Sequence, residues 1–406
     1  MDSGHTAWML VASALVFFMT PGLAFFYGGL VRVKNLVNTI MFSFMSLVIV
    51  SIVWVLWGYS LTFQDGGSLN SFIGDFSAFG LSGIDVNSGD SYPALIDVLF
   101  QMMFAIITPA LITGAFVERF RITTYLVFTV IWITLVYAPI CHWVWGGGWL
   151  GGDGIGALDF AGGTVIHINA GVAAWVAAMV IGKRNNPGSR PNNVPYVVLG
   201  AAILWLGWFG FNAGSQLAAD GIAASAFLVT NTAAATAALT WGVISHIKHG
   251  KMGAVGVATG AVAGLVAITP GAGFVGIYGS LAIGFGAGVI CFFVVDLINS
   301  FGLDDALDVF AVHGVGGIWG AIATGIFAVE AIGGTKGLIE GNFAQVGIQA
   351  IGVVATILYS GIVTFVILKV LDIIPGLKLR ATEEEENLGL DIAHHGEQAN
   401  VGDGAD

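Results

Sequence analysis

The stretch from Asp159 to Trp175, DFAGGTVIHINAGVAAW, places a carboxylate and an imidazole in a run that is otherwise small or apolar. His167 follows Asp159 by eight residues, which is about 12 Å along a helix that rises 1.5 Å per residue. A hydrocarbon layer is about 30 Å thick, so a membrane helix that begins near Asp159 carries this imidazole to mid-depth. Ionisable groups at that depth are costly, and His167 indicates a functional site unless one backbone carbonyl simply satisfies it.

The composition identifies the solvent around that stretch. The chain has 406 residues, of which 56% are hydrophobic and 9% are charged, whereas about 25% of the residues of a soluble domain are charged. These values indicate a protein of the lipid bilayer and give no reason to expect a nucleic-acid partner. The start, MDSGHTAW, lacks a basic region, so we expect the first apolar run to be a permanent span rather than a cleaved signal. Cys141 and Cys291 lie in apolar segments without metal-ligand spacing and are expected to be buried thiols.

The apolar runs predict an all-α polytopic membrane protein. A span needs about 20 apolar residues, and eleven runs meet this condition, at approximately 7–31, 36–63, 94–117, 124–143, 162–181, 194–216, 222–247, 254–270, 276–300, 309–329 and 343–371. Lys and Arg gather in alternate connections, which predicts a cytoplasmic position for those connections. We therefore expect the N-terminus outside the cell membrane and the C-terminus in the cytoplasm.

The chain also has two similar halves. TPGLAFFYGGL near the end of the first run resembles LGWFGFNAGSQL near the end of the sixth, and DFAGGTVIHINAGVAAW in the fifth resembles DVFAVHGVGGIWG in the tenth. Five is odd, so the second half must enter the membrane from the opposite side, as in the inverted repeats of many transporters. We expect a transmembrane domain at 1–379, with repeats at about 7–181 and 194–329 and an extra helix at about 343–371, followed by a cytoplasmic tail at 380–406.

The inverted repeat predicts a meeting of two histidines. His313 lies five residues after Asp308 and approaches mid-depth from the inside, whereas His167 approaches from the outside. Neighbouring imidazoles can hydrogen-bond, one donating and one accepting, and they resist double protonation because like charges repel in a low dielectric. Such a pair could relay a proton or bind a small polar solute, but it would bind a bare cation only weakly.

These motifs resemble one known family. GALDFAGGTVIHINAG, WFGFNAGS, DDALDVFAVHGVGGIWG and EEEENLGLDIAHHGEQA are similar to the ammonium transporter family, the Amt, Mep and Rh proteins, and most of all to its bacterial and archaeal Amt branch. The resemblance covers essentially the whole chain. It implies eleven helices, a homotrimer with one pore per subunit, and transport of ammonium or ammonia, with methylammonium as an analogue and without cofactor or metal.

The resemblance also implies roles for particular residues. His167 and His313 correspond to the twin pore histidines. The outer ammonium site would be formed by Trp149, Ser215, Phe104 and Asp159, with Asp159 behind the site as a structural and electrostatic acid. An interfacial tryptophan, or a serine that ends a helix, is the alternative for Trp149 and Ser215. Phe104 also pairs with Phe211 as the stacked gate of the outer mouth.

Two further predictions concern the second half and the tail. Asp308 is expected at the mirror position of Asp159 as a second structural acid, or as the N-cap of the tenth helix. The tail is either a solvated segment or, as the resemblance implies, a regulatory segment that lies along the cytoplasmic face, couples subunits and is contacted by a PII signal protein. Many relatives have Tyr where this chain has Asn400.

Three alternative functions compete with transport of the ion. A metal enzyme needs clustered ligands, and none of the eight histidines provides them at the required spacing. An ammonium sensor on the same scaffold would usually add a signalling domain after the last helix. A neutral, Rh-like gas channel is the closest mechanistic competitor. The acidic outer connections favour capture of the charged ion, which would lose its proton and cross as ammonia, with or without that proton.

Overall fold

The protein is a bundle of helices. The computed structural model describes residues 1–188 and 190–399, and this part contains no β-strand, only two isolated bridges. The α-helices are α1 (Ser3–Leu30), α2 (Leu36–Val53), α3 (Tyr59–Phe63), α4 (Ala94–Ile112), α5 (Ile122–Trp132), α6 (Ala138–Trp145), α7 (Asn169–Ile181), α8 (Val194–Gly214), α9 (Gly221–His249), α10 (Ala254–Ile268), α11 (Ile277–Phe301), α12 (Gly316–Phe327), α13 (Glu330–Gly333), α14 (Phe343–Ile373) and α15 (Glu383–Leu388).

Shorter helical turns of two other kinds connect these helices. The π-helical segments are η2 (Trp54–Gly58), η6 (Ile133–Tyr137), η7 (Gly163–Ile168), η8 (Phe310–Val315) and η10 (Asp391–His395). The 3-10 segments are η1 (Val33–Asn35), η3 (Gly67–Leu69), η4 (Phe79–Leu81), η5 (Thr113–Ala115) and η9 (Leu338–Glu340). Four of the π-helical segments continue into an α-helix without a break, so that the chain keeps its direction through them.

Ten helical segments in the described part of the chain are long and apolar enough to cross a membrane. They correspond to ten of the eleven expected runs. The eighth run, expected at 254–270, is met by α10, which has 15 residues and is shorter than the others. The count of eleven spans therefore stays a prediction.

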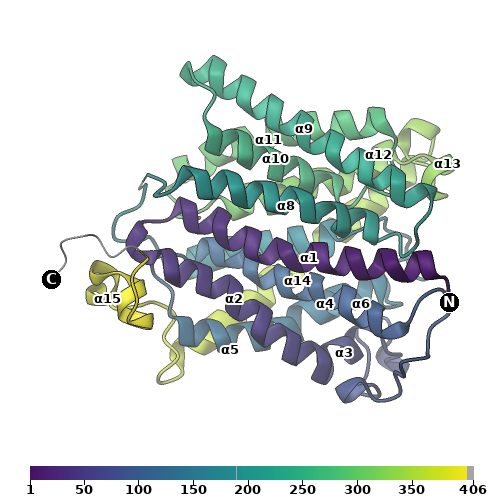
Figure 1. Cartoon of the computed structure of the whole chain (residues 1–406), viewed down its shortest axis with the longest axis horizontal. Helices are drawn as coiled ribbons and strands as arrows, with labels where there is room; N and C mark the ends of the chain where they lie inside the picture. Colours follow the sequence, from purple (N-terminus) through teal and green to yellow (C-terminus); the bar gives the residue numbers. More distant parts are fainter. Residues whose placement is uncertain (189, 400–406) are drawn as a thin grey trace.

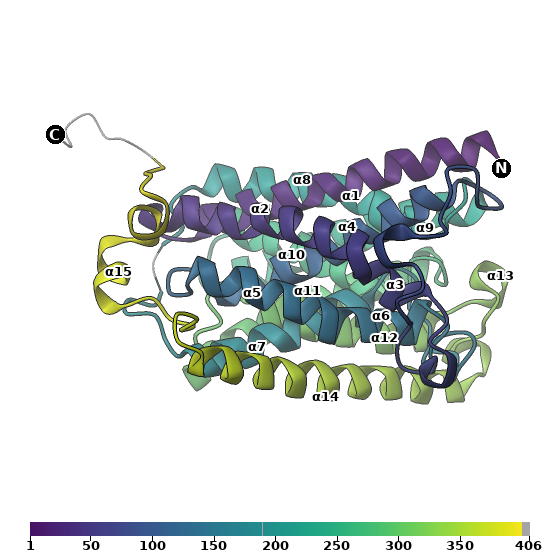
Figure 2. The ribbon, with the colours of Figure 1, turned by 90° about the horizontal axis from the view of Figure 1, so that it is seen from below.

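The long helices run lengthwise through the molecule. Figure 1 shows the N-terminus at one end of the bundle and α15, in the tail, at the other. We call these ends the N-side face and the tail-side face. In Figure 2, α14 extends along one flank of the bundle from one face to the other, where it packs against α7 and α12. The N-terminus and the tail therefore lie at opposite faces.

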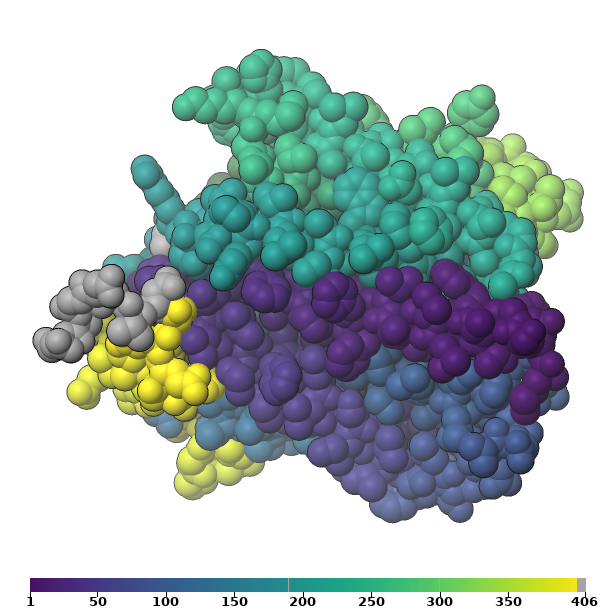
Figure 3. All heavy atoms as spheres, in the orientation of Figure 1, coloured from purple at the N-terminus to yellow at the C-terminus, as the bar shows by residue number. Residues whose placement is uncertain are grey.

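α1 and α8, the first helices of the two halves, pack against each other in opposite directions. Gly200 of α8 lies against Gly22 of α1, and Gly210 lies against Ala12, so that residue numbers rise along one helix as they fall along the other. A Cβ atom at Gly200 would lie 2.6 Å from the carbonyl oxygen of Gly22, which explains why the backbones can approach only through glycine. The surfaces of α1 and α8 meet along the length of the molecule in Figure 3.

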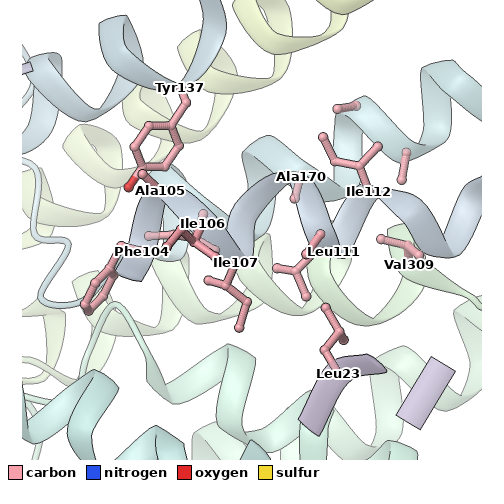
Figure 4. Packing of buried hydrophobic residues seen from close by; sticks show 14 of the residues in the cluster. Leu23, Phe104, Ala105, Ile106, Ile107, Leu111, Ile112, Tyr137, Ala170 and Val309 are labelled. Atoms are coloured by element: carbon pink, nitrogen blue, oxygen red, sulfur yellow. The ribbon is translucent and has the colours of Figure 1, made fainter. Parts of the chain in front are cut away.

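The core is built around α4. Residues Met102 to Ile112 of this helix are all buried. Figure 4 shows side chains of α4 near Tyr137 of η6, Ala170 of α7, Leu23 of α1 and Val309, the residue before η8. Because neighbours enclose this buried part of α4, the side chain of Phe104 has a fixed position in the middle of the bundle.

Candidate functional site

Two buried histidines meet in the interior of the bundle. His167 lies on η7 and His313 on η8, and their Nδ1 atoms are 3.2 Å apart. The rings are nearly parallel, with centroids 5.3 Å apart and an interplanar angle of 25°. Only one of the two Nδ1 atoms can carry the shared proton, so the neutral pair contains opposite tautomers. We call this pair the histidine dyad.

Glycine residues let the two histidine-bearing segments approach. Gly171, four residues after His167, lies against the backbone of Gly314, and an added Cβ atom would overlap the Gly314 backbone. Gly317, four residues after His313, lies against Gly163, where a Cβ atom would come within 3.1 Å of the carbonyl oxygen. Both contacts recur at the same offset from a histidine, so both halves use one solution to bring the imidazoles together. Single π-helical turns of this kind are frequent at functional sites.

Asp159 caps the start of η7. Its carboxylate accepts hydrogen bonds from the amides of Gly162 (2.8 Å), Gly163 (2.5 Å) and Thr164 (2.8 Å), and from the Thr164 hydroxyl. A carboxylate in this position satisfies the free amides at a helix start and interacts favourably with the positive end of the helix dipole. Since these donors occupy both oxygens, the carboxylate of Asp159 holds the backbone at the start of η7, and its role as a structural acid stays a prediction.

The corresponding acid of the second half is Asp305 rather than Asp308. Asp305 accepts a hydrogen bond of 2.7 Å from the amide of Phe310 at the start of η8. It precedes His313 by eight residues, as Asp159 precedes His167, so that both pairs differ by 146 positions (305 − 159 and 313 − 167). The expectation that Asp308 caps this helix or mirrors Asp159 is wrong, because the amide of Phe310 donates to Asp305, and the side chain of Asp308, a residue with φ +57°, makes no hydrogen bond to the start of η8.

A cavity of about 340 Å³ opens on the N-side face, and we call it the N-side cavity. Its lining includes Asp97, Phe100, Gln101, Phe104, Trp145 and Ser215. The Ser215 hydroxyl donates a hydrogen bond of 2.8 Å to the carbonyl of Phe211, which leaves the lone pairs of its oxygen as acceptors. The wall of the cavity thus combines aromatic rings with oxygen acceptors, which suits a small cation with N–H groups.

The tryptophan that lines this cavity is Trp145, and the expected assignment to Trp149 is wrong. The indole of Trp145 lies edge-on to Phe104, with ring centroids 6.0 Å apart, and its Nε1 donates to the carbonyl of Asp159. The turn through Gly146–Gly148 carries Trp149 to the other side of α6, where it packs against Trp143 at 5.8 Å. Four residues would place both side chains on one helix face, but α6 ends at Trp145 and the periodicity is lost.

Two stacked rings separate the N-side cavity from the histidine dyad. Phe104 and Phe211 are buried, with centroids 4.2 Å apart and an interplanar angle of 29°. Phe104 lines the cavity, whereas the ring of Phe211 lies 6.0 Å from that of His167. Trp208 stacks on the same imidazole at 5.3 Å, and its Nε1 donates to Thr269, which fixes the indole.

A second cavity of about 150 Å³ begins on the other side of the dyad, toward the tail-side face, and we call it the tail-side cavity. His313, Tyr27 and Asp308 contribute to its lining. Burial, and next the neighbouring charge of Asp305, raise the pKa of Asp308 to about 8. From the N-side face to the tail-side face, the groups therefore follow in this order: a cavity, two phenyl rings, two imidazoles, and a second cavity with a titratable acid.

The family model described as the Ammonium Transporter Family matches residues 7–400. The chain belongs to this family. The ammonium transporter of Aquifex aeolicus is 53% identical over 405 residues, which cover 98% of this chain and 94% of that protein. The crystal structure of Saccharomyces cerevisiae Mep2 is 38% identical, with a TM-score of 0.88, over 95% of this chain and 88% of that one.

Another similar solved structure is named Sensor Amt Protein. It is 30% identical, with a TM-score of 0.87, and the match covers 97% of this chain and 98% of that one. Relatives with the name ammonium transporter are transport proteins rather than enzymes. This chain is thus an ammonium transporter and a multi-pass protein of the cell membrane.

The tail of this ammonium transporter packs on the tail-side face of its own chain. The carboxylate of Asp391 accepts hydrogen bonds from the amides of Val37 (3.0 Å) and Asn38 (2.8 Å) at the start of α2. Glu385 pairs with Arg121 at 3.1 Å. Asn400 lies outside the described residues.

The described part of the transporter contains no group of three His, Cys, Asp or Glu residues that could hold a metal ion. Sequence reasoning missed Trp145, Asp97 and Gln101 of the N-side cavity, and the capping role of Asp305. The spacing of eight residues that Asp159 and His167 share with Asp305 and His313 is present in the sequence and could have revealed the last of these.

Proposed function

We propose that this transporter captures ammonium in the N-side cavity, removes its proton and conducts ammonia past the histidine dyad. The observation that carries the proposal is the order of groups along one line: a cavity with acceptors, the rings of Phe104 and Phe211, and then His167 and His313. Each group suits the chemical form of the substrate expected at that depth.

Capture depends on charge and on N–H donors. An ammonium ion that enters the N-side cavity meets the rings of Trp145 and Phe104, and a cation over an aromatic face gains about 0.5 to 2 kcal/mol. Ser215 presents acceptor lone pairs to one of its N–H groups, because its own proton is committed to Phe211. Water and neutral solutes lack this combination of charge and four donors.

Passage of the gate favours the neutral form. Phe104 and Phe211 offer no polar group to replace the hydration shell of a cation, and an unpaired charge in an apolar site is very costly. Ammonia, in contrast, can donate to and accept from the imidazoles of the dyad. Beyond the dyad, the tail-side cavity holds Asp308, whose pKa of about 8 suits it to exchange a proton with the departing ammonia.

The proposed topology has eleven crossings, with the N-terminus outside and the tail in the cytoplasm. Support comes from the positions of the N-terminus and the tail at opposite faces, the alternation of basic connections and the antiparallel packing of α1 on α8. The constant separation of 146 positions between paired acids and paired histidines supports an inverted repeat, with the site at the repeat interface. A homotrimer and a PII protein at the tail are further parts of this proposal, on the basis of the family resemblance.

The experiment that tests the proposed function changes the dyad. We expect the double variant His167→Ala, His313→Ala to lose the normal proton-linked ammonium transport, measured as currents on a supported membrane after an ammonium pulse. His167→Glu is expected to keep some ammonium flux and to admit potassium, because an ionised carboxyl stabilises a cation in the pore. Wild-type ammonium transport together with wild-type exclusion of potassium in the double variant would refute the role of the dyad.

The same measurement separates the alternatives. A neutral, Rh-like gas channel gives ammonia flux in liposomes but no current, and a sensor binds ammonium with little flux of either kind. The current and the change of internal pH, recorded on one preparation, therefore assign the chain to one of the three classes.

A further inference from the structure

The N-side cavity contains an acid for which the proposed function has no role yet. Asp97 and Gln101 lie one turn apart on α4, at positions i and i+4, and both line the cavity. Phe100 and Phe104 lie on the same face of the helix and also line it. Residues three and four apart share a helix face, so this side of α4 presents a carboxylate, an amide and two rings to the cavity.

The oxygens of both polar side chains have capacity left for a ligand. The phenol of Tyr59 lies 3.4 Å from one carboxylate oxygen of Asp97, and the phenol of Tyr92 lies 3.4 Å from the other. These are long hydrogen bonds, and a carboxylate has about four lone-pair sites, so at least two remain. The Oε1 atom of Gln101 is buried without a hydrogen-bond partner among the described residues.

Within the described part of the chain, no positive side chain lines the N-side cavity to neutralise Asp97. The acid is half-buried, and its field is screened less than that of the exposed acids of the N-side loops. A carboxylate without a cationic partner next to an orphaned acceptor is costly unless a cation with hydrogen-bond donors occupies the cavity. The two phenols hold the carboxylate in position without removing its charge.

We propose that Asp97 selects for positive charge in the N-side cavity, its carboxylate concentrating ammonium there while the amide oxygen of Gln101 accepts one of its N–H groups. The inference rests on the proposed function, because it takes ammonium as the occupant of this cavity. With Ser215, the two residues bring three acceptor side chains to the lining of the cavity, which matches a cation that carries several N–H groups. Neutral ammonia gains little from the carboxylate, so Asp97 favours the ion at the entrance.

The test is removal of the charge with little change of shape. For Asp97→Asn we expect a rise of about tenfold in the half-saturation concentration of ammonium currents at low ionic strength, with the maximal current largely kept. The difference should shrink at high salt. Asp90→Asn serves as the matched control, since it removes one acid from an exposed N-side loop outside the cavity and should leave half-saturation unchanged.

Two more variants keep the proposal falsifiable if Asp97→Asn folds poorly. Asp97→Glu keeps the charge and should retain nearly wild-type half-saturation. Gln101→Glu in the Asp97→Asn background moves the charge by one turn within the same cavity and should restore part of the loss. A double variant as weak as Asp97→Asn alone would overturn the electrostatic role.

The outcome is distinguishable from a failure of the proposed function. If Asp97→Asn has wild-type half-saturation while Trp145→Leu raises it, the cavity still binds ammonium and only the inference about Asp97 is overturned. If the double histidine variant transports like the wild type, the proposed function fails whatever Asp97 does.

Discussion

At the scale of single residues, two tryptophans four positions apart lie in different surroundings. Trp145 presents its ring to the N-side cavity beside Phe104, whereas Trp149 packs against Trp143 outside that cavity. A cation–π attraction requires a ring face open to the ion. Trp145 meets this requirement, and a comparison of variants at the two tryptophans is decisive.

We expect Trp145→Leu to raise the half-saturation concentration for ammonium and methylammonium about fivefold, because it removes an attraction of about 1 kcal/mol without a large cavity in the core. Uptake of labelled methylammonium into proteoliposomes measures this change. Trp149→Leu is the control, since it removes an indole of the same size and should leave half-saturation as it is. Equal effects of the two changes would contradict the assignment of Trp145.

A site residue can be predicted from the sequence only where its chemical type differs clearly from that of its neighbours in the chain. His167 and His313 are conspicuous because each is an ionisable group inside an apolar run, and the inverted halves suggest that they meet. Trp145 and Trp149 have no such contrast, since both flank the same glycine turn, and only its backbone direction decides which ring reaches the cavity. The sequence gives equally little reason to notice Asp97, because an acid in the first turn of a helix is ordinarily exposed to water and interacts with the helix dipole.

At the scale of elements, the two histidine-bearing helices can cross closely because glycine residues, which lack a Cβ atom, lie at the contact. Gly171 packs on Gly314, and Gly317 packs on Gly163. A methyl group at either contact would push η7 and η8 apart, and a buried hydrogen bond of 3.2 Å between imidazoles does not survive such a shift. The glycines therefore set the geometry of the dyad as directly as the histidines do.

We expect Gly171→Ala to destabilise the protein by about 1–3 kcal/mol, as overpacked cores do, and to reduce ammonium currents. Thermal unfolding in detergent and the maximal current measure the two effects. Gly347→Ala in α14 is the matched control, because a Cβ atom there has no neighbour within 4 Å. It should leave transport unchanged and stabilise its helix by about 0.5–1 kcal/mol. A Gly171→Ala protein with wild-type stability would show that the contact between Gly171 and Gly314 has room for a methyl group.

Element boundaries are predictable within a few residues, whereas their caps are not. The run DDALD offers three acids before the tenth span. Simple adjacency to the apolar run favours Asp308, but the left-handed backbone at Asp308 gives the capping position to Asp305. Such a backbone conformation is uncommon for residues other than glycine, so sequence alone provides little warning of it.

At the scale of the whole molecule, the tail and the tail-side face form one polar network. Arg184 and Arg119 pair with Asp304 at 2.8 and 3.0 Å, and Arg380 pairs with Glu386. Burial raises the pKa of Asp304, but hydrogen bonds from Arg184 and the charge of Arg119 lower it by more, to below its ordinary value. The ion pairs of Asp304 therefore stay formed at cytoplasmic pH. The amide of Ala381 donates a hydrogen bond of 2.8 Å to the carbonyl of Arg119, which connects the tail to these pairs.

We expect Asp391→Ala to release η10 from the start of α2, with loss of two charge-assisted hydrogen bonds. The tail should then become sensitive to protease while the membrane helices keep their thermal stability, and transport should change. Glu383→Ala is the control, because Glu383 is exposed and makes no ion pair with a described residue. Truncation after Leu379 should have the same effect on transport as Asp391→Ala. Wild-type transport by the truncated protein would show that the tail has no regulatory role.

The cap that Asp391 provides for α2 also has a consequence for biosynthesis. The carboxylate follows the amide of Val37 by 354 positions, so the start of α2 is completed by a residue that is made only after helices α2 to α15. At about 5–20 residues per second, the interval is on the order of tens of seconds. During that time only water can accept hydrogen bonds from these amides. A nascent chain that stalls before the tail therefore keeps an uncapped helix start at the membrane surface.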